Sequence, residues 1–182
     1  MQLIDQTPDE ICQALGLPGF ETKWNRAASD QELRLLLLPT FHPELCITFS
    51  EYDATTSVTV TCAQSKMSPF EQPSPSPVDQ DTGRLRNTRL ADLETSLRKA
   101  LVEPDHLSLS RDGLIVYISW RTFNARLIVE YANPEADSAL GVFVGRVIAE
   151  AYQSIKSSAC KGSLAEAGLY LGRNLASPQA DA

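Results

Sequence analysis

Histidine and cysteine are the side chains best suited to catalytic or metal chemistry, and this chain of 182 residues has only two histidines and four cysteines. His42 lies in a proline-bounded corner, and His106 follows shortly after a helix-stopping proline. A metal site needs several His, Cys or carboxylate ligands at short spacing, and no such cluster is present in the sequence. We therefore expect both histidines to be surface or locally hydrogen-bonded residues, and we expect no metal and no cofactor.

Sequence motifs of common enzyme classes are also missing. The chain has no G-x-S-x-G elbow, no phosphate-cradling glycine loop and no H-E-x-x-H motif. Gly141-Val-Phe-Val-Gly145 resembles the start of a dinucleotide fingerprint, but no parallel strand–turn–helix unit surrounds it. The sequence thus favours a non-enzymatic protein, and an enzyme that acts on a small molecule through residues distant in the chain is an alternative.

The most informative stretch, residues 112–131, is predicted to be one β-hairpin. A register that opposes Arg121 and Arg126 sorts its side chains into two faces, whereas a slip of one residue mixes them. The first face then carries the aromatic and β-branched set Val116, Ile118, Trp120, Leu127, Val129 and Tyr131. The second face carries Tyr117, Ser119, Arg121, Arg126 and Glu130.

The tip of this hairpin is the predicted partner-binding site. Phe123 lies at the tip, beside the opposed Arg121 and Arg126. Opposed like charges destabilise a sheet by about 0.2–1 kcal/mol, a cost that an acidic neighbour or a partner could offset. We predict that Arg121, Phe123 and Arg126 contact another protein; the alternative is that Phe123 folds back onto its own sheet.

The four cysteines are widely separated in sequence and form no C-x-x-C motif. We expect reduced thiols, most of them buried, in a cytoplasmic protein. Four cysteines also allow three disulfide pairings, of which Cys46–Cys62, on adjacent predicted strands, is the one to test. The positions are Cys12, Cys46, Cys62 and Cys160.

Composition narrows the class of partner. The net charge of −7 and the pI of about 4.8 argue against nucleic acid, because phosphate contacts need clustered Lys and Arg. A basic protein partner is compatible with this charge. No uninterrupted apolar run reaches the roughly 18–20 residues of a membrane span, and the N-terminus lacks the pattern of a signal peptide. We therefore expect a cytoplasmic protein that does not bind membranes.

Periodicity and turn residues predict an α+β fold. We expect a single antiparallel sheet of about five strands in the order α-βββ-α-ββ-α, with the helices packed on one face. The expected domain is 1–175, with a Pro-rich surface loop at 64–87 and a frayed tail at 176–182. Besides the hairpin, the expected elements are a helix from Thr7, strands at 32–38, 45–51 and 56–62, a helix at 88–102, a helix from Asp137 or Ser138 to Gly162, and a short helix from Ser163.

Two stretches carry a resemblance to known proteins. Leu35-Leu-Leu-Leu-Pro-Thr-Phe-His-Pro43 and Asp112-Gly-Leu-Ile-Val, within roughly residues 32–152, resemble uncharacterised small bacterial α+β proteins with a β3-α-β2-α order. Small acidic bacterial proteins of this sort include immunity proteins that neutralise a toxin, so the resemblance implies a protein-binding role. No functional residue carries over from it.

A second resemblance is to type III secretion chaperones, which are small, acidic and cytoplasmic and share the predicted order of elements. The stretch Ile11-Cys-Gln-Ala-Leu-Gly-Leu-Pro18 is similar to their first helix, although the Pro-rich loop is longer than that family usually carries. The first hypothesis is therefore an immunity protein that occludes its partner toxin. The second is a chaperone-like dimer that holds an effector segment along its sheet, and sequence leaves open whether the chain is a monomer or a homodimer.

Overall fold

The computed structural model describes residues 7–20, 31–67, 77–85, 88–102, 113–122 and 125–175. Within these residues the chain forms four helices and one antiparallel sheet of six strands, where about five strands were predicted. The α+β class and the single antiparallel sheet are confirmed. The elements are α1 (Pro8–Ala14), β1 (Gln31–Pro39), β2 (Leu45–Tyr52), β3 (Thr55–Ala63), β4 (Val78–Arg84), α2 (Leu90–Val102), β5 (Leu114–Arg121), β6 (Arg126–Ala132), α3 (Ala139–Ser154) and α4 (Ser158–Leu169).

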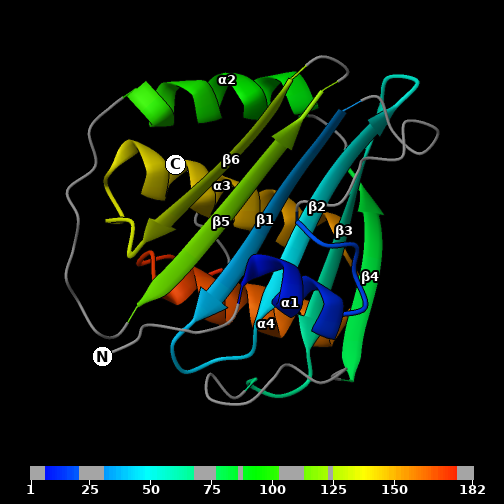
Figure 1. Cartoon of the computed structure of the whole chain (residues 1–182), viewed down its shortest axis with the longest axis vertical. Helices are drawn as coiled ribbons and strands as arrows, with labels where there is room; N and C mark the ends of the chain where they lie inside the picture. The colour runs from blue at the N-terminus through cyan, green and yellow to red at the C-terminus, as the bar shows by residue number, and fades with distance from the viewer. Residues whose placement is uncertain are drawn as a thin grey trace.

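The central strand β1 carries leucines on both of its faces, and both faces are covered (Figure 1). The strand order is β4-β3-β2-β1-β5-β6, so β1 pairs with β2 on one side and with β5 on the other. Leu33, Leu35 and Leu37 pack under α2, α3 and α4, on what we call the three-helix face. Leu36 and Leu38 pack under α1, on what we call the α1 face. Burial on both sides was predicted from the sequence and is confirmed.

The prediction that the helices pack on one face is wrong for α1. Ile11 and Leu15 of its apolar stripe belong to a cluster with Leu36 and Leu38, on the face opposite the other three helices. A helical stripe shows which side of the helix is buried. It does not show which face of the sheet covers that side, because either face of β1 could accept an apolar helix.

The register predicted for the β5–β6 hairpin is confirmed. Arg121 lies opposite Arg126, and Trp120 lies opposite Leu127. The apolar side chains of β5 face the three-helix core, where burial of each large side chain contributes roughly 1.5–3 kcal/mol. The register follows from this burial, since a one-residue slip would move the whole apolar set to the other face.

Strand β4 lies inside the segment that was predicted to be a surface loop, so that prediction is wrong for residues 78–84. β4 is an edge strand that pairs with β3 along its whole length. The residues of β4 are mostly charged or polar and show no alternation of apolar side chains. Backbone hydrogen bonds to β3 hold the strand in the sheet, so its sequence needs no such pattern. Gly83 permits close packing, since a Cβ at this position would lie 2.0 Å from the carbonyl oxygen of Ser154 at the end of α3.

The helix starts were predicted more accurately than the last helix boundary. Thr7 and Glu10 form the predicted capping box, and Ser138 caps α3 as expected. The predicted end of this helix at Gly162 and the restart at Ser163 are wrong: α3 ends at Ser154, and α4 runs through Gly162.

A carboxylate from the sheet accounts for the break between α3 and α4. Asp81 of β4 accepts hydrogen bonds from the backbone N–H groups of Lys156 and Ser157, both at 2.6 Å. These hydrogen bonds hold the pKa of Asp81 below its usual value. The Ser157 hydroxyl then caps the N–H of Cys160 at 3.3 Å and starts α4.

The proposed Cys46–Cys62 disulfide pairing is also wrong. Although β2 and β3 are neighbours, Cys46 lies opposite Thr61, and Cys62 lies opposite Leu45. Cys46 belongs to the cluster of the α1 face and Cys62 to that of the three-helix face. Side chains that differ by one position in register point to opposite faces of a sheet, so these two sulfur atoms cannot meet. All four cysteines are free and buried, as expected for reduced core thiols.

Candidate functional site

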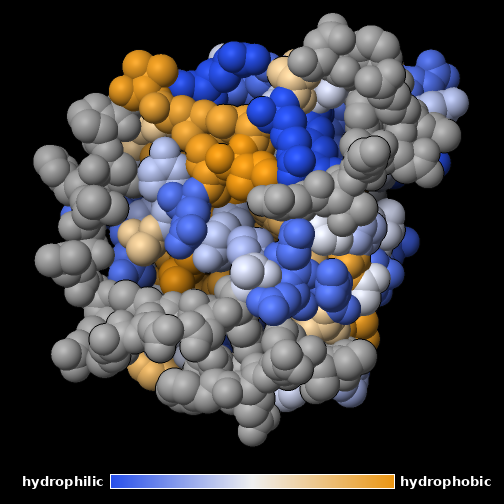
Figure 2. Space-filling view, in the orientation of Figure 1, coloured by the Kyte–Doolittle hydropathy of each residue, from blue (hydrophilic) through white to orange (hydrophobic). Residues whose placement is uncertain are grey.

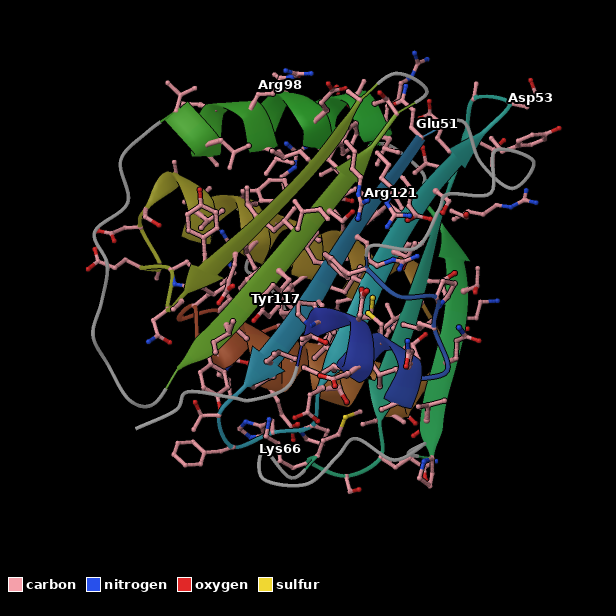
Figure 3. All side chains as sticks on the ribbon, in the orientation of Figure 1. Glu51, Asp53, Lys66, Arg98, Tyr117 and Arg121 are labelled. Atoms are coloured by element: carbon pink, nitrogen blue, oxygen red, sulfur yellow. The ribbon has the colours of Figure 1, made fainter. Side chains whose placement is uncertain are left out.

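The β2–β3 and β5–β6 connections lie at the same end of the sheet, which we call the turn end. It comprises residues 51–55 together with residues 121, 122, 125 and 126. The register fixes this arrangement, because β1 opposes Gln31 to Glu51 on one side and Glu32 to Arg121 on the other. Figure 3 shows Glu51, Asp53 and Arg121 toward this end and Lys66 at the opposite end.

Arg121, predicted as a contact residue, is buried inside the chain. It is 5% exposed, and its guanidinium donates hydrogen bonds to the Phe20 carbonyl and, at 3.3 Å, to the Ser119 hydroxyl. The opposed Arg126 is exposed, and its guanidinium donates to the same Phe20 carbonyl at 3.0 Å. Phe123 lies outside the described residues. Of the two predicted arginines, therefore, only Arg126 has an exposed side chain.

Charges within the chain act on Arg121 in both directions. Burial lowers the pKa of Arg121, and the charges of Arg34 and Arg126 lower it further. The carboxylate of Glu32, directly across from Arg121 on β1, acts in the opposite direction. Arg34 also forms an ion pair with Glu32 at 3.3 Å and donates to the Pro18 carbonyl at 2.9 Å. These arginines bind the segment that follows α1 to the sheet.

The second turn at this end exposes an aromatic side chain that the sequence analysis did not single out. Tyr52, the last residue of β2, is 60% exposed. The next two residues, Asp53 and Ala54, have φ angles of 48° and 57°, as in the tight two-residue turns that join hairpin strands. Thr56 donates a hydrogen bond to the Glu51 carboxylate at 3.1 Å across the base of the turn. The signal available in the sequence was the short gap between two clearly alternating strands.

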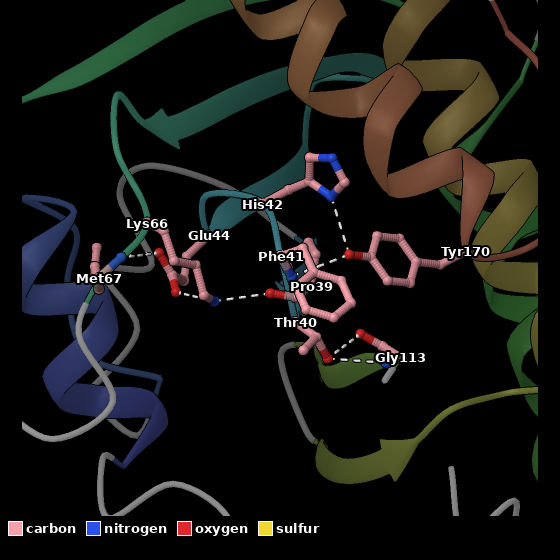
Figure 4. Close-up of polar contacts among 9 residues, drawn as sticks. All are labelled: Pro39, Thr40, Phe41, His42, Glu44, Lys66, Met67, Gly113 and Tyr170. Carbon is pink, nitrogen blue, oxygen red and sulfur yellow. Dashed lines mark hydrogen bonds and ion pairs between the residues drawn. The ribbon is translucent and has the colours of Figure 1, made fainter. Parts of the chain in front are cut away.

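The opposite end of the sheet, which we call the corner end, is built around residues 39–44 (Figure 4). His42 lies there, and its Nδ1 is 3.0 Å from the Tyr170 hydroxyl. The same hydroxyl oxygen accepts the Phe41 N–H at 3.1 Å, so Tyr170 joins the His42 ring to the backbone of the corner. His42 is therefore locally hydrogen-bonded, as predicted, while His106 lies outside the described residues.

A buried ion pair completes the corner end. The Glu44 carboxylate, in a residue only 4% exposed, pairs with Lys66 and accepts the Met67 N–H at 3.0 Å. Lys66 also donates to the Pro39 carbonyl at 2.8 Å. Figure 4 shows how these contacts join the corner to Lys66, Gly113 and Tyr170. These contacts hold the β1–β2 connection in place.

A polar cleft of about 1150 Å³ lies where β4 meets the end of α3. Its charged lining residues include Arg84, Glu150 and Lys156, and Glu150 accepts a hydrogen bond from the Thr88 hydroxyl at 2.6 Å. The described residues that line it include neither His nor Cys. The lining also includes the hydroxyl groups of Ser57, Thr82 and Ser154. The cleft thus offers volume, hydroxyl groups and charge to a small molecule.

Comparisons with other proteins add no family assignment. No family model, curated protein or solved structure matches the chain. Across the described ranges, no three His, Cys, Asp or Glu side chains gather as metal ligands would. In the same part of the chain, no helix has the length and apolarity that crossing a bilayer demands. The contact surfaces described above are therefore the features from which a function can be argued.

Proposed function

We propose that this chain is a non-enzymatic protein-binding module that neutralises a partner, as an immunity protein neutralises a toxin. The observation that carries the proposal is Tyr52, an exposed aromatic held at the start of a tight turn and flanked by Glu51 and Asp53. Tyrosine is enriched at interfaces because it buries a large area while few rotatable bonds are fixed. A turn whose backbone is already ordered lowers the entropy lost on binding.

Charge supports a basic partner. The acidic residues beside Tyr52 and the net charge of −7 would attract a positively charged protein and speed its association. The exposed Arg126 at the same end could pair with a carboxylate of that partner and set the orientation. Neutralisation by this route needs only that the bound module covers the functional surface of the partner.

The first test is affinity capture of the tagged chain from its native host, with the bound proteins identified by mass spectrometry. A single basic, toxic protein recovered in equal amount supports neutralisation. A secreted effector recovered with two copies of this chain supports the chaperone alternative. Recovery of no partner argues against both binding functions and directs attention to ligands of the polar cleft.

A matched pair of variants then tests the surface. Tyr52→Ala should reduce recovery of the partner about tenfold or more, as loss of an aromatic hot spot does. Phe41→Ala is the control, because Phe41 is 66% exposed and lies at the corner end. Equal loss of partner in both variants, or loss in the control alone, contradicts the assignment of the turn end.

An apolar surface favours the alternative, a chaperone-like homodimer. Figure 2 shows apolar surface over β6 and one end of α2. Val102 of α2 is 83% exposed and Ile128 of β6 is 39% exposed, so burial against a second copy would be favourable. Light scattering of the purified chain decides between the two. A dimer that Ile128→Lys dissociates, and that Val142→Lys on α3 does not, supports this alternative, whereas a monomer supports the neutralising module.

A further inference from the structure

The polar cleft between β4 and the end of α3 has walls that the fold itself holds in place. Gly83 of β4 lets the backbone of Ser154 approach closely, because a Cβ at Gly83 would lie 2.0 Å from the Ser154 carbonyl oxygen. The Thr88 hydroxyl donates to the Glu150 carboxylate at 2.6 Å and so joins the segment before α2 to α3. Ile155, which also lines the cleft, belongs to the three-helix core. The cleft is therefore formed before a ligand binds, as small-molecule sites usually are.

Two cations of the lining have no counterion in the described part of the chain. Arg84 and Lys156 are both exposed, and neither side chain forms an ion pair or a hydrogen bond with a described residue. By contrast, Arg34, Lys66 and Arg98 each pair with a carboxylate. In a chain with a net charge of −7, two unpaired cations that line one cleft favour an anionic ligand.

The carboxylate of Asp81 lies beside the cleft but is directed to backbone groups. It accepts the N–H groups of Lys156 and Ser157, as described above, and also the N–H of Thr82 at 2.8 Å. Asp81 therefore moderates the positive charge of Lys156 and leaves its ammonium group available to a ligand.

The hydroxyl groups of the lining offer acceptors to a ligand. Ser57 donates its proton to the Ser50 carbonyl at 3.3 Å, and Ser154 donates to the Glu150 carbonyl at 2.8 Å. Thr88 donates to one oxygen of the Glu150 carboxylate, and the second oxygen accepts no hydrogen bond from a described residue. A hydroxyl that has donated its proton still has lone pairs that can accept. A ligand that contacts these groups must therefore bring hydrogen-bond donors of its own.

Hydroxyl groups suit these acceptors better than an ammonium group. An ammonium group would add a third positive charge beside Arg84 and Lys156, where Glu150 is the one carboxylate of the described lining. Like charges repel at short range, whereas a hydroxyl donates without carrying charge. For the anionic part of the ligand, a phosphate monoester carries about −1.5 to −2 charge at pH 7 and three acceptor oxygens, which suits two cations.

We propose that this cleft binds a phosphorylated polyol of the sugar phosphate class. Arg84 and Lys156 hold the phosphate, and Glu150 with the neighbouring hydroxyl oxygens accepts hydrogen bonds from the hydroxyl groups of the ligand. The observation that carries the proposal is that two unpaired cations and a set of free acceptors line one preformed cleft. The inference goes beyond the partner-binding function and does not depend on it, because residues 51–54 do not line the cleft.

The test is isothermal titration calorimetry of the full chain with glucose 6-phosphate, ribose 5-phosphate and glycerol 3-phosphate. We expect at least one of these esters to bind with a Kd below about 1 mM, and glucose and inorganic phosphate to bind at least about tenfold more weakly. Failure of all three esters to bind at about 10 mM overturns the proposal. Inorganic phosphate bound as tightly as the esters, or glutamate bound more tightly, also contradicts it, since these probes lack the hydroxyl groups of a polyol.

Matched variants test the two cations. Arg84→Met and Lys156→Met should each weaken binding about fivefold or more, because each removes a charge-assisted contact to the phosphate. Arg98→Met is the control: it removes the same charge from α2, outside the cleft, and should leave the Kd within about twofold. Circular dichroism checks that each variant folds, and the wild-type titration decides the proposal if one does not. Equal loss of affinity in all three variants would overturn the assignment, since net charge alone would then explain the binding.

Discussion

The two ends of the sheet use their polar residues in opposite ways. At the corner end, Glu44, Lys66 and Tyr170 find partners within the chain, so their hydrogen-bonding capacity serves the fold. At the turn end, Arg121 is buried and makes hydrogen bonds within the chain. Tyr52 is exposed, and it precedes a tight turn whose backbone is ordered. The hydrogen-bond network of the corner end therefore stabilises the fold, whereas the exposed Tyr52 on an ordered turn is a place where another molecule could bind.

The ion pair of the corner end should give the largest effect. Lys66→Met leaves the Glu44 carboxylate buried without its cation and should lower the free energy of unfolding by about 2 kcal/mol, less than for a fully buried pair because Lys66 is partly exposed. Denaturant unfolding measures this value. The double variant Lys66→Met with Glu44→Leu should recover part of the loss. A Lys66→Met variant within about 0.5 kcal/mol of the wild type would show that the pair contributes nothing.

Arg121 offers the corresponding test at the turn end. Arg121→Met removes donors to the Phe20 carbonyl and to Ser119 and should cost about 1–2 kcal/mol, because the buried Ser119 hydroxyl loses a partner and the Phe20 carbonyl keeps only Arg126. The exposed Arg126→Met, measured by the same unfolding method, is the matched control and should cost less than about 0.5 kcal/mol. Equal costs at the two positions would mean that the burial of Arg121 has no energetic consequence.

The tyrosine of the corner end should have a smaller effect. Tyr170→Phe removes the hydroxyl that joins His42 to the Phe41 N–H and should cost about 1 kcal/mol, the usual value of one net hydrogen bond. Thermal unfolding measures the change. Tyr152→Phe is the control, because no hydrogen bond within the described part of the chain links the Tyr152 hydroxyl to the corner. A similar loss in both variants would assign the effect to tyrosine in general.

The strongly apolar elements could be predicted from sequence because burial leaves a pattern. The β5–β6 register followed from the sorting of its side chains into two faces, and the burial of β1 followed from leucines at successive positions. Strand β4 could not be predicted in this way, because it lies at the edge of the sheet and pairs with β3 through its backbone. Its sequence is Val-Asp-Gln-Asp-Thr-Gly-Arg, which has no apolar pattern. The break after α3 was missed because it depends on Asp81, a residue distant in sequence.

The candidate site could be predicted only in part. The sequence predicted a contact surface at the β5–β6 hairpin, but the burial of Arg121 depends on the Phe20 carbonyl, a backbone group far away in sequence. It did not single out Tyr52, because exposure of one aromatic cannot be told from its residue type. The short β2–β3 connection was visible in the sequence, whereas its meeting with the other hairpin at one end of the sheet required the register of β1 with both neighbours.

The smallest predicted effect concerns the backbone of the turn itself. Ala54 has a φ of 57°, which glycine adopts without the steric cost of a Cβ, so Ala54→Gly should raise the free energy of unfolding by roughly 0.5–1 kcal/mol. Gly16→Ala is the reverse control: φ is 70° there and no atom lies within 4 Å of the added Cβ, so a loss of about 1 kcal/mol would come from the backbone alone.

The same variant also links the turn to binding. If the ordered turn is what makes Tyr52 an effective anchor, the greater backbone freedom that Ala54→Gly introduces should weaken partner recovery several-fold while the fold becomes more stable. Opposite changes in stability and in binding are difficult to explain for a turn that only connects two strands. If Ala54→Gly raises the stability of the fold and leaves the recovery of the partner unchanged, the order of the turn does not contribute to binding. The contact would then depend on the side chains of Tyr52 and its acidic neighbours.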